Sequence, residues 1–319
     1  HNFECEIMDV IEKSGVGKFG YLALRTITKS GLEKLQKYAN EIISQKSVSK
    51  VHEGCSSDGL YEADNFNAIF HLVTHDIDRN VGDLFKRATM ACFLLKCLQQ
   101  TAFFDSLKDD EKIKMETFVG GCLLSHLQSF PCNAHEISEL QLNEVSVDTS
   151  VPKETGAGIY STLSLFNHSC DPVVNRNFYG DVCVVRTIKP IKAGEEISDN
   201  YGALYAVHSY QERQEKLAPQ YYFNCACEPC ANKWPLYPDI PYDKPVWKCS
   251  SCCSPLQLNQ DNKVGVCSMC KQPYDLKKKG KLIADAKLLY DAAFESLLSC
   301  DVEKAIPGLL NYLEVLDVH

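Results

Sequence analysis

Three short stretches decide the fold: residues 167–172 (NHSCDP), residues 194–201 (GEEISDNY) and residues 221–230 (YYFNCACEPC). Each of the first two is modest alone, because the first could be a loop and the second a turn before a strand. The third is more specific, because its three cysteines stand close together. In this order, the three stretches predict one composite site rather than three independent features.

The cysteines of the third stretch predict a metal site. Cys225, Cys227 and Cys230 leave a tetrahedral zinc ion one ligand short. Cys170 can supply the fourth thiolate from a distant part of the chain. The zinc would then fix the third stretch against the first. Buried cysteines without a metal are the less favoured interpretation, because this spacing is characteristic of zinc ligands.

A second group of cysteines predicts another metal site. Cys249 and Cys252 form one C-x2-C pair and Cys267 and Cys270 a second, in the pattern of a zinc ribbon. Cys253 could compete with Cys252, but the two-residue gap favours Cys252. Aromatic and basic residues do not alternate nearby, so a structural or protein-contact role is favoured over nucleic-acid binding. Residues 277–279, three lysines, are interpreted as a solvated face.

Composition narrows the classes of protein that remain. The chain has 319 residues and 17 cysteines, many in spacings too tight for a disulfide framework, which indicates a reducing compartment. The formal net charge of −9 gives no global basic field, so a nucleic-acid partner is not expected. No apolar run has the length needed to cross a bilayer, so no membrane partner is expected either.

Periodicity predicts helices at both ends of the chain and strands between them. Apolar residues recur at helical steps in residues 84–98, with a second helix suggested in residues 113–127, and residues 44–64 read as a polar loop. Residues 159–205 contain short β-rich runs such as VCVV at 182–185. Residues 281–299 return to helix, with Leu282, Leu289, Ala293 and Leu297 on one face, and a shorter helix is expected at residues 302–316.

One further motif is misleading. Residues 15–20 (GVGKFG) match the G-x-G-x-x-G pattern of dinucleotide sites. That site requires a buried strand immediately before the glycines, and residues 6–14 do not predict one. The glycines are therefore interpreted as a turn that precedes a helix near Tyr21.

Together the three stretches resemble the SET domain, with its N-H-S-C-x-P motif, its G-E-E-(x)n-Y motif and its C-x-C-x2-C post-SET tail. His1 and Cys5 look like the last two ligands of a MYND zinc finger, which ends in H-x3-C. The helical segment around residues 70–75 (FHLVTH) looks like the insert of SMYD-type enzymes. The extra cysteine module is similar to the fourth branch of that family, in an arthropod-like form.

The resemblance implies an α+β fold with a β-rich SET core. The expected parts are the end of a MYND finger (1–5), a helical insert (6–135), the SET core (136–224), the post-SET zinc tail (225–233), a zinc ribbon (240–275) and the start of a helical C-terminal domain (276–319). It also implies a protein-lysine N-methyltransferase that uses S-adenosyl-L-methionine, binds Zn2+ and acts on a lysine of a histone or non-histone protein, in cytoplasm and nucleus. Partners could bind through the MYND finger and the C-terminal helices.

The same resemblance assigns roles to residues. Tyr201 is the expected catalytic residue. Its hydroxyl would orient the amine or the methyl group and act electrostatically, rather than remove a proton. The substrate channel would be lined by Tyr221, Cys132 and His135, with plain core packing as the less favoured alternative for Tyr221. Six residues would bind the cofactor: Asn133, Ser164, Asn167, His168, Phe223 and His75, with a packed core histidine as the alternative for His75. Glu195 and Glu196 are interpreted as loop anchors, not as an acid pair.

Some features depart from the family pattern. Val173 and Val174 follow Pro172 where the motif usually continues with asparagine, and His135 stands where relatives often carry an aromatic residue. The family's glycine-rich strand, which also grips the cofactor, is expected to precede the MYND finger. We therefore expect the 319-residue chain alone to bind S-adenosylmethionine weakly or not at all, which calorimetry can test.

Two other functions compete with the enzyme. A catalytically silent SET-MYND scaffold, or transcriptional co-regulator, would recruit partners through its finger and helical C-terminus. A zinc-ribbon nucleic-acid binder would show salt-sensitive retention of DNA or RNA. Tyr201, Asn167 and His168 favour the enzyme, because a scaffold has no need of them.

Overall fold

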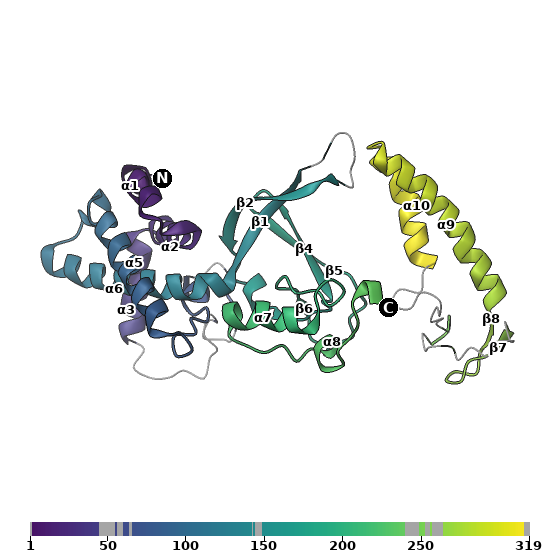
Figure 1. The fold of residues 1–319 in the computed structure, drawn as a ribbon. Helices are drawn as coiled ribbons and strands as arrows, with labels where there is room; N and C mark the ends of the chain where they lie inside the picture. The colour runs from purple at the N-terminus through teal and green to yellow at the C-terminus, as the bar shows by residue number, and fades with distance from the viewer. Residues whose placement is uncertain are drawn as a thin grey trace. The chain divides into compact units, whose positions relative to one another are not determined.

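A computed structural model describes residues 2–44, 55, 60–63, 66–141, 143, 149–239, 249–252, 256 and 264–315 (Figure 1). The chain divides into two compact units. The first consists of His1–Ser138 and Glu154–Tyr237, and the second of Glu139–Lys153 and Pro238–His319. Within the described residues, no helix combines the length and the apolar character that a membrane span requires.

The first unit begins with a group of helices. These are α1 (Asn2–Ser14), α2 (Gly17–Ser30), α3 (Leu32–Ser44), α4 (Phe66–Phe70), α5 (Val81–Leu98), the 3-10 turn η1 (Ala102–Phe104) and α6 (Asp109–Asn133). Asn80 starts α5 by accepting a hydrogen bond from the Asp83 backbone N–H at 2.9 Å, the usual work of an N-cap. The acidic side chains Asp109, Asp110 and Glu111 favour the first turn of α6 through the helix dipole.

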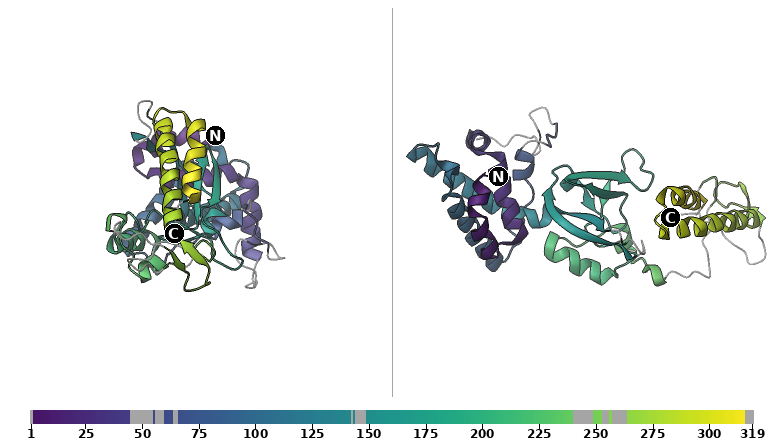
Figure 2. Two further views of the ribbon diagram at one scale, coloured as in Figure 1. Left: turned by 90° about the vertical axis from the view of Figure 1, so that its right-hand side faces the viewer. Right: turned by 90° about the horizontal axis from the view of Figure 1, so that it is seen from above.

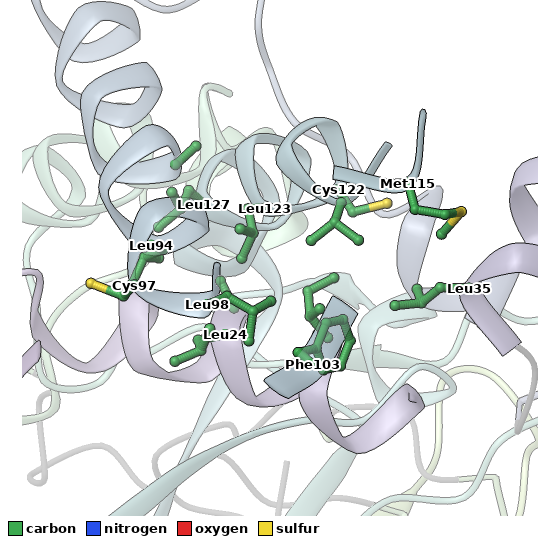
Figure 3. Packing of buried hydrophobic residues seen from close by; sticks show 14 of the residues in the cluster. Leu24, Leu35, Leu94, Cys97, Leu98, Phe103, Met115, Cys122, Leu123 and Leu127 are labelled. Atoms are coloured by element: carbon green, nitrogen blue, oxygen red, sulfur yellow. The ribbon is translucent and has the colours of Figure 1, made fainter. Parts of the chain in front are cut away.

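Leucines from several helices form the core of this group. Leu24 of α2, Leu94 and Leu98 of α5, and Leu123 and Leu127 of α6 converge in one cluster, and each is buried (Figure 3). The predicted stripe on α5 is confirmed, since its five members, at residues 84, 88, 91, 95 and 98, are buried or half-buried. On α6 the stripe is buried from residue 119 onward, whereas the predicted member Ile113 is largely exposed at the N-terminal end of the helix.

The glycine motif at residues 15–20 forms a turn between two helices. Gly15 and Gly17 have φ of +74° and +69°, and α1 rather than a strand precedes them. Left-handed φ values favour glycine because it lacks a Cβ. The turn interpretation is therefore confirmed, with α2 beginning at Gly17 rather than near Tyr21.

A histidine is fully buried in this core. His126 of α6 stacks on Phe130 at 4.8 Å between ring centroids and meets the Phe66 ring edge-on at 5.6 Å. Neither ring nitrogen has a hydrogen-bond partner in the described part of the chain. Burial lowers the pKa of His126 to about 3, so the side chain is neutral in the folded protein.

Acid should destabilise the protein partly through His126. The folded-state pKa lies below the unfolded one, so the contribution is complete above about pH 6.5 and is lost as pH falls toward 3. At pH 4.5 the linkage amounts to about 2.5 kcal/mol, so His126→Leu should shrink the difference in unfolding free energy between pH 7 and pH 4.5 by that order. Urea unfolding at both pH values measures this. The exposed His71→Gln is the control, and an acid loss unchanged in His126→Leu would contradict the prediction.

Short strands follow the helices. They are β1 (Ala134–Gln141), β2 (Val151–Ile159), β3 (Asn167–His168), β4 (Val174–Tyr179), β5 (Val182–Thr187) and β6 (Ser198–Asp199). In the described residues β1 pairs with β2, β4 with β5 and β3 with β6. The β4–β5 hairpin is antiparallel, with Val174 opposite Thr187 and Gly180 at φ +61° in the turn.

The parallel pair β3–β6 positions the site. Asn167 lies opposite Ser198 and His168 opposite Asp199. The Ser169 backbone N–H donates to the Asp199 carbonyl at 2.8 Å, which continues the pairing past the strands. The first and second decisive stretches of the sequence are thereby laid side by side.

Two helices complete the first unit. α7 (Tyr210–Tyr221) begins with a capping box, in which Ser209 and Glu212 satisfy each other's backbone N–H groups. It ends at Tyr222, which has the left-handed conformation with φ 58°. The short α8 (Glu228–Ala231) follows, and the 3-10 turns η3 (Leu163–Leu165) and η4 (Tyr237–Asp239) are the remaining elements.

The second unit contains a small hairpin and two helices. β7 (Val264–Val266) pairs antiparallel with β8 (Pro273–Asp275), and α9 (Leu276–Leu298) packs along α10 (Val302–Val315) (Figure 2). Gly308 permits the close approach of the two helices, because a Cβ there would lie 2.8 Å from the Leu289 carbonyl oxygen. Both predicted helices are confirmed.

The buried face of α9 agrees with the predicted one only in part. The predicted Ala293 is buried and the predicted Leu297 is half-buried, whereas Leu282 and Leu289 are more than half exposed. Ala286, which was not among the predicted residues, is also buried. The contact with α10 uses small side chains because the helices approach closely, so large apolar residues were a poor guide to the buried face. The predicted polar loop at residues 44–64 lies mostly outside the described residues.

Candidate active site

Four cysteine sulfurs from two distant stretches meet in the first unit. Cys170, Cys225, Cys227 and Cys230, here the first cysteine cluster, have sulfurs all within 4.8 Å of one another. The Cys170 sulfur lies 3.9 Å from that of Cys225 and 3.6 Å from that of Cys230. Tetrahedral zinc with Zn–S bonds of about 2.3 Å places its sulfurs about 3.8 Å apart. The cluster therefore fits a zinc ion, and the predicted fourth ligand is in place.

Backbone hydrogen bonds hold these stretches together. The Cys170 N–H donates to the Cys227 sulfur at 3.4 Å, and the Tyr205 N–H donates to the Cys170 carbonyl at 3.0 Å. The Gln214 side chain of α7 makes two hydrogen bonds to the backbone of Cys225. Its Nε2 donates to the Cys225 carbonyl and its Oε1 accepts from the Cys225 N–H, each at 2.9 Å. The folded chain thus brings the four sulfurs together through contacts of its own.

Burial disfavours ionisation of two of the thiols in this cluster. Burial raises the pKa of Cys170, and it raises that of Cys225 to about 12. For Cys227 burial acts in the same direction, but backbone N–H groups of Cys170 and Cys230 outweigh it and lower the pKa. A cation at the centre would favour the thiolate form of all four.

The second unit holds the other cluster. Cys249, Cys252, Cys267 and Cys270, the second cysteine cluster, also have sulfurs within 4.8 Å of one another. The sulfurs of Cys249 and Cys270 are 3.5 Å apart, and those of Cys252 and Cys267 are 3.7 Å apart. These spacings also fit tetrahedral zinc. The competing Cys253 lies outside the described residues.

Tyr201 lies beside the first cluster, just after β6. Its backbone N–H donates to Nδ1 of His168 at 3.0 Å, and its hydroxyl donates to the Phe166 carbonyl at 2.5 Å. Asn200, the residue before Tyr201, also bonds to the first stretch, because its Nδ2 donates to the Ser169 carbonyl at 2.9 Å. The parallel strands therefore bring the phenol of the second stretch to the histidine of the first.

Aromatic rings from all three stretches gather around Tyr201. The Tyr201 ring centroid lies 4.7 Å from that of Tyr221 and 5.2 Å from that of His168. Phe223 lies 6.0 Å from His168 and 6.5 Å from Tyr221, measured between centroids. These four residues, here the aromatic cluster, come together as the sequence predicted.

The phenols of the aromatic cluster are neutral. Burial, reinforced by the nearby Asp199 carboxylate, raises the pKa of Tyr201. Burial and the neighbouring Tyr201 raise the pKa of Tyr221 to about 12. Asp199 is itself buried and paired with Arg176, which also donates to the Asn200 carbonyl at 3.1 Å. The arrangement offers hydroxyl dipoles and aromatic faces, not a strong base.

The sequence profile of the SET domain matches residues 18–202. The chain belongs to the SET domain family. It is 24% identical to the protein-lysine N-methyltransferase SMYD4 of Pongo abelii, over 98% of this chain and 44% of that protein. It is 26% identical to the SMYD4 of Homo sapiens (81% and 37%) and 33% identical to the histone-lysine N-methyltransferase SMYD3 of Mus musculus (33% and 24%).

The likeness to SMYD proteins confirms the predicted family, while the arthropod-like form stays a prediction. The chain spans less than half the length of these relatives.

The polar residues predicted for cofactor binding in this SET domain form two groups. Asn167 is exposed and donates from Nδ2 to Oε1 of Glu196 at 2.7 Å. Ser164 donates from its hydroxyl to the Asn133 carbonyl at 3.1 Å, and the Asn133 amide donates to the Ser129 carbonyl at 2.7 Å. Ser164 and Asn133 therefore lie together, and the cofactor roles of all three stay predictions.

The paired glutamates hold loops, as predicted. Glu196 accepts from Asn167, and Oε2 of Glu195 accepts from the Lys192 backbone N–H at 2.9 Å. Neither carboxylate lies against the other as an acid pair would require.

The predicted channel residues Cys132 and His135 lie on either side of the junction between α6 and β1. The Cys132 thiol donates to the Gln220 carbonyl at 3.1 Å, beside Tyr221. His135 packs edge-on against Tyr160 at 6.0 Å, and burial lowers its pKa to about 4. Its Nε2 has no partner among the described residues. Their role toward substrate stays a prediction.

The remaining predicted zinc finger lies at the start of the chain. His1 is outside the described residues. Cys5 is exposed on α1 and belongs to neither of the cysteine clusters found in the described part of the chain. The MYND assignment therefore stays a prediction.

His75 contacts a residue that sequence reasoning overlooked. Its ring stacks on Tyr222 at 4.8 Å, and its Nδ1 lies 3.3 Å from an Asp78 oxygen. Arg79 also contacts Tyr222. Its guanidinium carbon lies 5.1 Å from the centroid of the Tyr222 ring, and its Nη1 donates a hydrogen bond to the Tyr222 hydroxyl at 3.0 Å. Tyr222 separates Tyr221 from Phe223, so this contact joins the loop before α5 to the aromatic cluster.

Arg79 itself is almost completely buried. It donates to the Thr74 carbonyl and to Asp83, each at 2.8 Å, and to the Gln128 carbonyl. No motif marks it, because its distant partners include a single carbonyl of α6 and the Tyr222 hydroxyl. Only its position between charged and aromatic residues in the folded chain shows its role.

Loss of Arg79 should destabilise the first unit. Arg79→Met removes the donors from several buried acceptors, and we expect a loss of about 2–3 kcal/mol in unfolding free energy. Urea unfolding at neutral pH measures it. Lys112→Met is the control, because the exposed pair of Lys112 with Asp105 at 3.8 Å should contribute less than about 1 kcal/mol. An Arg79 variant as stable as the control would contradict the prediction.

Proposed function

We propose that this chain carries the catalytic region of a protein-lysine N-methyltransferase of the SET type. The substrate would be a lysine side chain of a histone or non-histone protein. The main support is the aromatic cluster, which places the neutral phenol of Tyr201 beside Tyr221, His168 and Phe223 and next to the first cysteine cluster. The relatives named above are themselves protein-lysine or histone-lysine methyltransferases.

The residues present fit S-adenosylmethionine. Aromatic faces attract cations, so the rings of Tyr201, Tyr221 and Phe223 suit a sulfonium group. When bound, the cofactor supplies a methyl group on a positively charged sulfur, from which the neutral amine of lysine displaces a thioether. We propose that four residues hold the polar parts of the cofactor: Asn167, His168, Ser164 and Asn133. Phe223 would stack on the adenine ring, and His75 would contact the cofactor from the helical insert.

For this methyl transfer, the protein must align the lysine amine with the methyl group and exclude water from the site. Tyr201 and Tyr221 would orient the amine nitrogen through hydroxyl and ring contacts, and proximity of this kind can contribute several kcal/mol. Because burial raises the pKa of Tyr201, its hydroxyl is not the base. Burial of the amine near a positive charge lowers the lysine pKa, so the proton can leave to water before transfer.

The structural parts follow from the same proposal. We assign residues 6–135 to a helical insert, 136–224 to the SET core, 225–233 to a post-SET tail, 240–275 to a zinc ribbon and 276–319 to the start of a helical C-terminal domain. Residues 1–5 would end a MYND finger. Zinc in the first cluster would fix the tail beside the aromatic cluster. Cytoplasm and nucleus are the proposed locations, with protein partners and no membrane or nucleic acid.

A methylation assay tests this function. The full-length protein, rather than the 319 residues alone, is incubated with tritiated S-adenosylmethionine and an array of lysine-containing peptides, and the array also identifies the substrate. We expect label on lysine peptides and none on peptides with arginine in its place. Folded, zinc-loaded protein that labels nothing would instead support the scaffold.

A further inference from the structure

One arginine is buried without a carboxylate. Arg213 of α7 is completely inaccessible to solvent. Its Nη1 donates to the His208 carbonyl at 2.7 Å, and its Nη2 lies 3.4 Å from the Pro229 carbonyl and 3.5 Å from the Cys230 sulfur. Its Nε has no partner, and no carboxylate pairs with it, within the described part of the chain.

A buried guanidinium needs a negative partner. Removing a charge from water costs several kcal/mol unless an opposite charge and hydrogen bonds compensate. Arginine stays protonated in proteins, so this charge cannot be avoided by deprotonation. The carbonyls supply hydrogen bonds but no net charge.

The first cysteine cluster supplies that charge when it binds metal. Four thiolates around one Zn2+ carry a net charge of −2, and Cys230 is one of the four. We propose that Arg213 is the counter-charge of this cluster and stabilises its thiolates and hence its zinc. It is a positioning residue that acts through the metal site, and the inference does not depend on methyl transfer.

The construction of α7 supports this role. The capping box at Ser209 fixes the start of the helix, and the next turn presents Arg213 and Gln214 together. Arg213 reaches Cys230 while Gln214 holds the backbone of Cys225. One helical turn thus contacts both ends of the C-x-C-x2-C segment, once by charge and once by hydrogen bonds.

The second cluster provides a control inside the same chain. The sequence contains no arginine after Arg213, so the segment that carries the second cluster, residues 249–270, has no arginine of its own to neutralise its thiolates. An effect of Arg213 should therefore be confined to one of the two metal ions.

Zinc release to a chelator tests the proposal in the whole 319-residue chain. A metallochromic dye follows the two ions expected per chain in wild type, Arg213→Lys and Arg213→Gln. In Arg213→Gln, which keeps donors but loses the charge, we expect one ion to leave 10- to 100-fold faster and the other at the wild-type rate. Arg213→Lys should remain within a few-fold of wild type.

The comparison of the two variants separates charge from packing, because a packing defect should accelerate zinc release in Arg213→Lys and Arg213→Gln alike. Adding Cys267→Ser to remove the second site should leave the fast phase in place.

Several results would overturn the proposal. They are unchanged release in Arg213→Gln, equal acceleration in the lysine and glutamine variants, acceleration confined to the second site, and a first cluster that takes up no zinc in wild type. If Arg213→Gln does not fold, Arg213→Lys tests the proposal alone. The proposal then requires Arg213→Lys to fold and to retain both zinc ions, and failure to do so would contradict it.

Discussion

Cys170→Ser should remove one of the two expected zinc ions and with it the active site. Cys170 is the only ligand of the first cluster that does not come from residues 225–230. Without it, three thiolates remain on one short segment, and the metal no longer joins that segment to residues 167–172. Structural zinc sites can contribute of the order of 10 kcal/mol of folding free energy, so the local loss should be large.

We expect the Cys170 variant to bind one zinc ion by elemental analysis and to unfold at lower urea concentration. Labelling of lysine peptides should fall below detection, because Phe223 and Tyr221 flank the released segment. Cys183→Ser on β5 is the matched control, since Cys183 is half-buried but outside both clusters. A Cys170 variant that retains two zinc ions and full activity would contradict this account.

Tyr201→Phe should abolish most methyl transfer while leaving the fold intact. The change removes a single hydroxyl and keeps the ring that packs on Tyr221 and His168. Loss of one pre-organised hydrogen-bonding group in an active site lowers kcat by about 100-fold or more. Cofactor affinity and zinc content should stay close to wild type, because the hydroxyl contacts neither cysteine cluster.

The pH profile adds a second test of Tyr201. Because burial raises the pKa of its phenol, the group stays protonated through the alkaline range in which lysine becomes a neutral amine. The rate of wild type should therefore rise with pH and show no loss below about pH 10 from Tyr201 ionisation. Tyr205→Phe is the control, since it also removes a phenol hydroxyl and the Tyr205 ring packs edge-on against Trp234. Equal rates for Tyr201→Phe and wild type would remove Tyr201 from the reaction.

The residues that sequence predicted best are those with rigid spacing requirements. The C-x-C-x2-C spacing is characteristic of zinc ligands and leaves one ligand to come from elsewhere. The resemblance to SET domains, with their N-H-S-C motif, pointed to Cys170 for that place. Tyr201 and His168 could be named through the resemblance to SET domains. Their meeting through β3 and β6 could not be derived from periodicity, because two-residue strands have none.

The residues that sequence missed are buried arginines. Arg79 and Arg213 each donate to a carbonyl five residues earlier and also reach a distant segment, the Gln128 carbonyl and the Cys230 sulfur respectively, and no motif marks that second contact. The face of α9 was predicted only in part, for a different reason. Close approach at Gly308 selects small side chains, so the predicted Ala293 is buried, whereas the predicted Leu282 and Leu289 are more than half exposed.

The most direct test of the central claim follows a trideuterated methyl group from S-adenosylmethionine by mass spectrometry. The peptide that labels best on the array is incubated with the full-length wild-type, Tyr201→Phe and Tyr205→Phe proteins at equal zinc loading. This account predicts the heavy methyl on the lysine ε-nitrogen with wild type and Tyr205→Phe, and little or none with Tyr201→Phe. Heavy methyl on another atom, or equal labelling by all three proteins, would contradict it.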